Sequence, residues 1–449
     1  METNQIMTEI SSTIVSNCGR CSLVFALIAV LIAGANIPAS QGASPYPDSP
    51  IITGFSLDWS THRRSAQGSD NFQLTWSDDD HLYGAWGDGG GFGGTNTNGR
   101  VGLGVARISG PGHNWKGTNR WGGLNPENPA QFGGKGKSWG MICVDGVLYL
   151  LVVPDIVPGK GYRNHYEYVE IWKSCDHSAT WRRPLWKFLQ SENLTIPTFL
   201  NFGRDNAGVP SELGDYVYVY FIHPQNATME QQGPKGVGLV VHKPGIIYLA
   251  RVPRKNITGS KSDYQFYCGL DSADNPLWGS ISQKQPVFED PDGVGWCMSA
   301  HYNSVLQRYI LCTEHDSSHV GRIGIFDAPT PWGPWTTVEY CTKANPFGKT
   351  RPGSNLPWRN NVFFIAFATK WLSEDGKSFT LNFTGGGQGS DNDSFNTVSG
   401  TFMVSGARTA DSIAQHPIED AEPESGPASQ STSKSSTASL PAAVRVALI

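Results

Sequence analysis

The sequence has few charged residues and almost no stretch with a sustained helical period. Charged residues make up 16% of the 449 residues, and the net charge is -5. No basic stripe runs along the chain, so we expect no nucleic-acid partner. A Ser-His-Asp grouping, a phosphate-binding loop and a dinucleotide fingerprint are also missing, which argues against the enzyme classes that depend on them. We expect no cofactor.

The cysteines lack the spacing of a metal site. Of the eight cysteines, Cys18 and Cys21 lie near the N-terminus, and the others are Cys143, Cys175, Cys268, Cys297, Cys312 and Cys341. None of the six cysteines that follow the expected signal forms a CxxC pair or approaches histidine at zinc-finger spacing, so we expect no metal. A disulfide between Cys297 and Cys312 is one interpretation if they lie on adjacent strands. Buried free thiols are the other.

The two ends of the chain differ in composition from its middle. Residues 1–42 carry an apolar run followed by small residues, as in an export signal. The run is short for a membrane span, although an uncleaved anchor is the alternative. Residues 43–60 are a Pro/Ser-rich lead-in, and 407–449 have the composition of a disordered tail. We expect a monomer, secreted, periplasmic or at the cell surface, with one domain over 61–406 and no stable membrane insertion after signal removal.

Glycine, proline and aromatic residues are abundant, with 52 Gly, 29 Pro, 15 Trp, 15 Tyr and 20 Phe. Between about 70 and 405, short runs with strand-like alternation follow one another with turn residues between them. Many short strands with few helices are typical of an all-β sandwich, barrel or propeller. The clearest runs are 101–108, 139–153, 166–174, 215–223, 245–252, 295–303, 308–315, 319–328, 361–369, 378–385 and 394–404.

A local repeat favours the propeller. Residues 174–181, SCDHSATW, fit the form S-x-D-x-(G/S)-x-T-W, and residues 373–379, SEDGKSF, are a looser copy. The form resembles the Asp-box of sialidase-like propellers, a turn in which the aspartate caps backbone amides. The β-rich region is long enough for five four-stranded blades, and seven smaller blades are the alternative. The predicted fold is therefore a five-bladed, glycosidase- or sialidase-like β-propeller.

The stretch from Asp70 to Asp88 predicts a β-hairpin whose polar turn is centred on Asp79. That centre would place Trp76 opposite Leu82 and Asp70 opposite Asp88. Like charges directly opposite destabilise a sheet, so such a pair needs a functional reason. The glycine-rich run that follows, residues 89–94, would let the backbone approach a ligand.

Several blocks of the sequence resemble the family called domain of unknown function 4185. They are DNFQLTWSDDDHLYGAWGDGGGFGG, CVDGVLYL, NFGRDNAG, YVYVYF, IYLARVP, DAPTPWGPWTTV and KWLSEDGKSFTLNFTG, in that order, and the likeness spans about residues 50–405. That family is similar to glycosidase propellers and includes secreted endo-D-arabinanases that cleave furanosidic arabinan. The resemblance implies a five-bladed propeller with two essential aspartates near the first hairpin, which fall on Asp70 and Asp88.

Glycoside hydrolysis usually needs two carboxyl groups, one to protonate the leaving oxygen and one to activate water or attack carbon. We expect Asp70 and Asp88 to be this pair, with crowding raising one pKa. A turn-capping role for one of them is the alternative. Glu314, at a strand end, is a third catalytic candidate. Asp78, Asp79 and Asp80 are expected to be solvated turn residues, and Asp205 a loop cap.

A polysaccharide substrate would need aromatic faces and hydroxyl-binding groups. Candidates for substrate binding are Trp86, Phe92, Trp139, Trp296, Arg204, Lys137 and His301, with core packing or surface charge as the alternative for each. The predicted function is hydrolysis of an arabinan-like polysaccharide. The alternatives are a lyase on a uronate polymer, using His301, Tyr302 and Arg204, and a non-catalytic glycan-binding propeller.

Overall fold

The regular elements of this chain are β-strands and a few short 3-10 turns. The computed structural model describes residues 43–129, 136–154, 157–158, 164–225, 232–233, 236–237, 239–319, 321–342, 362–385 and 393–405. The expected signal at 1–42 and the expected tail at 407–449 lie outside these ranges. In the described part of the chain, no helix is long and apolar enough to cross a membrane.

The first two blades are four-stranded antiparallel sheets built from consecutive strands. Blade I contains β2 (Asp70–Trp76), β3 (Leu82–Gly87), β4 (Leu103–Ser109) and β5 (Lys116–Trp121). Blade II contains β6 (Lys137–Val144), β7 (Val147–Val153), β10 (Tyr168–Ser174) and β11 (Phe188–Leu189).

The next two blades share one continuous sheet because their inner strands pair. Strands β12 and β20 run parallel, with Leu200 opposite Ala300. Blade III contains β12 (Thr195–Asn201), β13 (Tyr216–Ile222) and β16 (Gly245–Pro253), followed by β17 (Gln265–Leu270), β18 (Pro276–Gly279) and β19 (Pro286–Asp290). Blade IV contains β20 (Ser299–Asn303), β21 (Arg308–Glu314), β22 (Ile323–Ala328) and β23 (Thr336–Tyr340).

Blade V combines strands from both ends of the described chain. The C-terminal strands β24 (Phe364–Leu372), β25 (Ser378–Thr384) and β26 (Phe395–Val404) are completed by β1 (Ile52–Ser65), which pairs antiparallel with β26. The propeller therefore begins at Ile52 rather than at residue 61, and much of the expected lead-in is its outermost strand. The pairing satisfies backbone groups that β26 would otherwise expose at a sheet edge.

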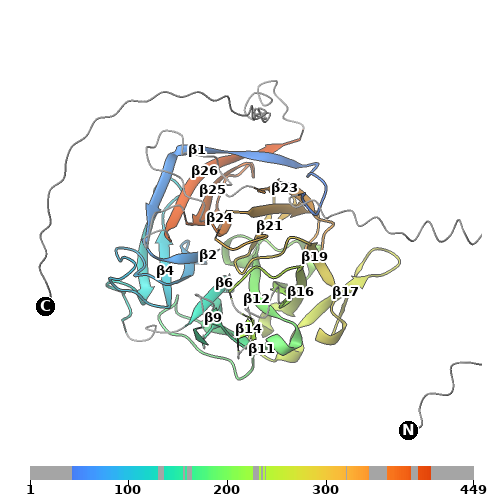
Figure 1. Ribbon diagram of the computed structural model, residues 1–449, viewed down its shortest axis with the longest axis horizontal. Coiled ribbons are helices and arrows are strands. Elements are labelled where there is room, and N and C mark those ends of the chain that lie inside the picture. Colours follow the sequence, from blue (N-terminus) through green and yellow to red (C-terminus); the bar gives the residue numbers. More distant parts are fainter. Residues whose placement is uncertain are drawn as a thin grey trace, which may run out of the picture. The chain divides into compact units, whose positions relative to one another are not determined.

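The five blades form a closed ring, which confirms the expected five-bladed β-propeller. Each inner strand packs against the next in the cyclic order β2, β6, β12, β20, β24 and back to β2. Figure 1 shows β2, β6, β12 and β24 around the centre, with β1 and β17 at the periphery. The alternative of seven blades is excluded by this strand order.

Minor elements lie in the connections. Two short antiparallel pairs are β8 (Val157–Pro158) with β9 (Asn164–His165), and β14 (Gln232–Gly233) with β15 (Gly236–Val237). The 3-10 turns are η2 (Gln190–Glu192), η3 (Arg204–Asn206), η4 (Ser211–Leu213), η6 (Arg254–Asn256), η7 (Lys261–Asp263) and η8 (Ile281–Gln283).

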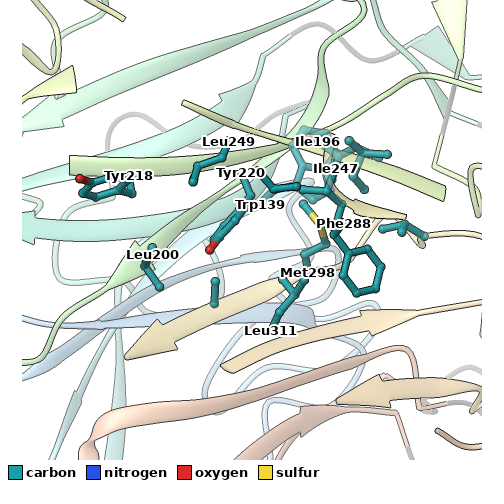
Figure 2. Packing of buried hydrophobic residues seen from close by; sticks show 14 of the residues in the cluster. Trp139, Ile196, Leu200, Tyr218, Tyr220, Ile247, Leu249, Phe288, Met298 and Leu311 are labelled. Atoms are coloured by element: carbon teal, nitrogen blue, oxygen red, sulfur yellow. The ribbon is translucent and has the colours of Figure 1, made fainter. Parts of the chain in front are cut away.

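Aromatic and aliphatic side chains fill the spaces between blades. The largest buried cluster contains Trp139 from blade II, Tyr218 and Tyr220 from blade III, and Met298 and Leu311 from blade IV (Figure 2). Full burial of such large side chains contributes roughly 1.5–3 kcal/mol each. This packing fixes the angle between neighbouring blades and so the positions at which the inner strands begin.

The Asp-box prediction is confirmed at residues 174–181. The carboxylate of Asp176 accepts hydrogen bonds from the backbone nitrogen of Thr180 at 2.8 Å and from the hydroxyl of Ser174 at 2.7 Å. The looser copy behaves similarly, since Asp375 accepts from the backbone nitrogen of Lys377 at 3.0 Å. Both carboxylates cap turns.

The cysteines of the described residues are free thiols, Cys297 and Cys312 included. Cys312 lies in β21 opposite Ser299, whereas Cys297 lies just before β20 begins. The disulfide interpretation is therefore wrong, and the alternative of buried thiols holds for this pair.

We expect Thr397→Val to destabilise the ring at the contact between blades I and V. The indole nitrogen of Trp115 donates to the hydroxyl of buried Thr397 at 2.9 Å. Valine would leave this buried N–H unsatisfied, at a cost of about 1–3 kcal/mol in unfolding free energy. Urea denaturation measures the change.

Thr401→Val is the matched control, because Thr401 lies in the same strand and is exposed. Its unfolding free energy should change by less than about 0.5 kcal/mol. Equal losses in the two variants would show that the Trp115 contact contributes nothing specific.

Candidate active site

The inner strands start at one end of the ring, and ionisable side chains gather there. Neighbouring inner strands of a propeller run in the same direction, as the parallel pairing of β12 with β20 shows. Asp70 is the first residue of β2, and Lys137 is the first residue of β6. We call Asp70, Asp88, Lys137, Cys297, Glu314 and His319 the mouth cluster.

The first hairpin forms as predicted near its turn and differs at its open end. Trp76 lies opposite Leu82, as expected, but Asp70 lies opposite Gly87 and not opposite Asp88. The cause is a bulge after Asp70, where Asn71 has a positive φ of 67°. The extra residue shifts the register, so the two carboxylates are not a directly opposed cross-strand pair.

Lys137 nevertheless brings the two aspartates into one environment. Its ammonium is 2.7 Å from Oδ1 of Asp88. A Cβ placed on Gly87 would lie 2.6 Å from both the Lys137 ammonium and Oδ1 of Asp70. Both groups therefore border the space left by the absent side chain of Gly87. Asp70 and Asp88 are thus neighbours of the same lysine, and their joint role in catalysis stays a prediction.

The two aspartates differ in solvation. Asp70 is only 4% exposed, and its Oδ1 has no hydrogen-bond partner. Burial raises the pKa of the Asp70 carboxyl well above its ordinary 3.8; the ammonium of Lys137 opposes the shift, and the charge of Asp88 adds to it. Asp88 is partly exposed and ion-paired to Arg100 at 3.1 Å as well as to Lys137. Desolvation outweighs the expected crowding as the main cause.

Glu314 is a third, fully buried carboxyl at the end of β21. Its Oε1 accepts from the backbone nitrogen of His319 at 2.6 Å, and its Oε2 accepts from the hydroxyl of Ser318 at 3.1 Å. Burial raises the pKa of Glu314 from 4.5 to about 8, against these hydrogen bonds. A Cβ at residue 295 would lie 2.3 Å from the Cβ of Glu314, so Gly295 leaves the room that this side chain needs.

Cys297 and His319 connect Glu314 to the aspartates. Burial raises the pKa of the Cys297 thiol well above its ordinary value, and the charges of Glu314 and Asp70 add to the shift. His319 is exposed at the surface, but its ring packs on Phe363 at 4.1 Å; this desolvation lowers its pKa to about 4, with a further contribution from the ammonium of Lys137. Such charge effects act through space over several ångströms, so they place these groups in one region of the ring. The mouth cluster thus contains two carboxyl groups with raised pKa values, Asp70 and Glu314, and a carboxylate, Asp88, that is ion-paired with two cations.

Comparison with known proteins finds similar structures and no sequence family. No protein-family model matches the chain, and no curated protein matches it. Similar solved structures include an α-L-arabinofuranosidase from Podospora anserina, with 8% identity over 81% of this chain and 96% of that chain and a TM-score of 0.39. A GH43_1 enzyme from Xanthomonas citri has 12% identity over 74% and 90%, with a TM-score of 0.39. A β-xylosidase has 12% identity over 75% and 94%, with a TM-score of 0.41.

The aromatic residues expected to bind sugar are packed inside the blades. Trp86 and Trp139 are both 0% exposed, and the Trp86 ring stacks on Phe72 at 5.8 Å. Phe92 is half-buried and contacts the ring of Trp115 at 5.9 Å. Neither tryptophan presents a ring face to solvent. These aromatic residues therefore serve the packing of the blades, and the prediction that they bind sugar finds no support in their positions.

Arg204 and His301 lie away from the mouth cluster. Arg204 follows the end of β12, where its guanidinium donates to the backbone oxygen of Asp78 at the hairpin turn. His301 is buried in β20 and lines a cavity of about 20 Å³ in the centre of the ring, with Gln73 and Asn382. Burial lowers its pKa to about 3, so it is a neutral imidazole there.

The turn acids are engaged by neighbouring side chains. Oδ1 of Asp78 is 2.9 Å from Nε2 of His177, and Asp80 is ion-paired to Lys370 at 2.8 Å. In the described ranges, two sets of donor atoms within 4.8 Å of one another are Asp78–Cys143–Asp205 and Asp78–Asp79–His177. Asp205 also accepts from the backbone nitrogen of Gly146 at 2.9 Å, a loop-capping contact of the kind expected.

Sequence reasoning underrated Lys137 and overlooked the parts of the cluster around Cys297 and His319. Lys137 has only 5% of its surface exposed, so the alternative of a surface charge is wrong. A signal for it exists: like Asp70, it is the polar residue immediately before a strand-like run. His319 has no comparable signal, since its place depends on the turn after β21.

We expect the stability of the protein to fall between about pH 4.5 and pH 8 through Glu314. Because the folded pKa is raised to about 8, the unfolded chain releases this proton in that range while the folded protein keeps it. In Glu314→Gln this contribution is absent, so its melting temperature should decline less with pH. Calorimetry at a series of pH values measures the difference.

Glu212→Gln is the control, because Glu212 is exposed. Its melting temperature should follow that of the unsubstituted protein at every pH. Parallel curves for Glu314→Gln and the unsubstituted protein would show that Glu314 is ionised in the folded state.

Proposed function

We propose that this protein is a glycoside hydrolase that uses the carboxyl groups of Asp70 and Asp88, with Glu314 as a third acid of the same site. One observation carries the proposal. A desolvated carboxyl that retains its proton lies beside a carboxylate paired with cations, and Lys137 adjoins both. An acid and a base in different environments are the parts that glycoside hydrolysis requires.

In the proposed reaction the protonated carboxyl and the ionised carboxyl have different roles. The protonated carboxyl delivers its proton to the glycosidic oxygen as the bond to the anomeric carbon breaks. The ionised carboxyl either removes a proton from water or attacks the anomeric carbon. Glu314, with its pKa raised to about 8, holds a further proton at the same end of the ring.

The substrate that we propose is a furanosidic, arabinan-like polysaccharide. Support comes from the ordered sequence blocks that resemble the domain of unknown function 4185 family, and we propose membership of that family on the same basis. Residues 1–42, with the order of an export signal, support action outside the cell, in the periplasm or at the cell surface.

The three residues that a lyase would use, His301, Tyr302 and Arg204, do not lie in the mouth cluster. His301 lies in the central cavity, while Tyr302 and Arg204 line a separate cavity that includes Trp76, where β2 ends. A lyase would need its base and its carboxylate-neutralising arginine on the same sugar. Hydrolysis is therefore the better-supported reaction.

We expect Asp70→Asn and Asp88→Asn each to lower the rate of hydrolysis by about 10²–10⁴-fold, because each removes one acid–base group. Reducing ends released from arabinans, galactofuranans and uronate-bearing polysaccharides measure the rate. Retention of the polysaccharide in affinity electrophoresis should persist in both variants.

Asp215→Asn is the matched control, since Asp215 is an exposed aspartate before β13 and outside the mouth cluster. Its rate should equal that of the unsubstituted protein. Products with the ultraviolet absorbance of unsaturated uronates would identify a lyase. Binding without turnover on all three polysaccharide classes would identify a glycan-binding propeller.

A further inference from the structure

We infer that Lys137 is a positioning residue that keeps Asp88 ionised and thereby leaves the proton of the pair on Asp70. This inference rests on the proposed function and assigns the acid and the base within it. In this inference, Lys137 of blade II determines which of the two aspartates of blade I carries the proton.

The ion pairs of the described residues join Lys137 to Asp88 and not to Asp70. The ammonium is 2.7 Å from Oδ1 of Asp88, and the guanidinium of Arg100 is 3.1 Å from Oδ2 of the same carboxylate. Each oxygen of Asp88 thus contacts a cation. Oδ1 of Asp70, by contrast, is buried without a hydrogen-bond partner.

The two cations of Asp88 are not equivalent. The side chain of Lys137 is 6% exposed and that of Arg100 is 42% exposed. Solvent and salt screen an exposed pair, so its contribution is small, whereas a buried pair is screened much less. Lys137 is therefore the dominant cation at this site.

Gly87 allows the ammonium of Lys137 to reach this position. A Cβ at residue 87 would lie 2.6 Å from the Lys137 ammonium, 2.8 Å from its Cδ and 2.6 Å from Oδ1 of Asp70. These separations are far below van der Waals contact, so any side chain would displace both groups. The position of the Lys137 ammonium, from β6, therefore depends on the absence of a side chain at Gly87, in β3.

The other charges around Asp70 and Asp88 do not change which of the two carboxyls keeps the proton. Asp70 also feels the negative charges of Asp88 and Asp393, which favour its protonated form, and the distant positive charge of Arg100, which opposes it. Burial by itself would lower the pKa of Lys137, but the charges of Asp70 and Asp88 raise it above its ordinary value against a smaller opposing effect of Arg100, so the ammonium stays charged. The lowered pKa of His319 leaves its imidazole neutral at pH 7, so it adds no second positive charge. Desolvation therefore leaves Asp70 as the group that keeps a proton.

The assignment gives a balanced reaction. Asp70 transfers its proton to the glycosidic oxygen, the bond from that oxygen to the anomeric carbon breaks, and the freed chain leaves as an alcohol. Water provides the new oxygen at the anomeric carbon. The water loses one proton. In a direct displacement Asp88 takes this proton, whereas after a covalent intermediate on Asp88 the proton goes to Asp70. Proton exchange then restores protonated Asp70 and ionised Asp88.

Lys137→Met tests the role, because methionine preserves the length and removes the charge. Both carboxyls lose an attractive charge, so both limbs of the pH profile of kcat/KM on a furanosidic arabinan should move upward by about 1–3 pH units. Arg100→Met, which removes the exposed cation on the same carboxylate, should move them by less than about 0.7 unit. Lys137→Arg should return the limbs toward their original positions.

A second measurement is independent of turnover. Carbon-13 NMR titration of the aspartate carboxyls, assigned with Asp70→Asn and Asp88→Asn, should show the carboxyl of Asp70 keeping its proton well above the ordinary pKa of 3.8. Lys137→Met should raise the pKa values of both carboxyls. Gly87→Ala, which keeps the lysine and displaces its ammonium, should shift them in the same direction.

The outcomes separate this inference from the proposed function. If Asp70 ionises at the ordinary pKa of an aspartate, or if Lys137→Met leaves the carboxyl titrations unchanged, the role of Lys137 is refuted whether or not the protein hydrolyses arabinan. If the titrations behave as expected and no polysaccharide is cleaved, the charge assignment stands and the hydrolase proposal fails.

Discussion

Closure of the ring by β1 is the constraint on which the site depends. Strand β1 pairs with β26, so the fifth blade contains both the beginning and the end of the described chain. That closure holds blade V against blade I. The buried amide of Asn382 donates to the backbone oxygen of Phe72 at 2.9 Å, and the backbone nitrogen of Gly68 donates to the oxygen of Asp393 at 2.7 Å. Asp70 begins its strand beside these contacts, so its surroundings exist only when the ring is closed.

Burial is the second determinant of the mouth cluster. A carboxyl in water ionises near pH 4, but removal of water penalises the charged form more than nearby hydrogen bonds compensate. Asp70 and Glu314 are in this position, and Lys137 is the buried cation between blades I and II. Such desolvated groups cost stability, and their concentration at one end of the ring is what makes that end a site.

Glycine provides space at two points of this arrangement. Gly87 gives room to the ammonium of Lys137, and Gly295 gives room to Glu314. Neither has the positive φ that would require glycine in a turn. Their role is close approach, since each leaves room for a charged side chain beside its own backbone. The abundant aromatic residues do the opposite and fill the blades, which is why Trp86 and Trp139 are core residues.

The sequence by itself determined the local features of this protein. Alternation of apolar and polar residues predicted most strands, the turn around Asp79 predicted the first hairpin, and two short repeats predicted Asp-box turns. Strand β1 was missed although Phe55, Leu57 and Trp59 alternate with polar residues, because the Pro/Ser-rich residues before it predicted a lead-in without strands. Strand β12 was missed because Pro197 interrupts its alternation. The hairpin also pointed to Asp70 and Asp88. Only the tertiary structure decided their register, because a single bulge at Asn71 shifts it. Lys137, Glu314 and His319 joined them because the ring brings together residues that are far apart in the chain, and local patterns carry no record of such contacts.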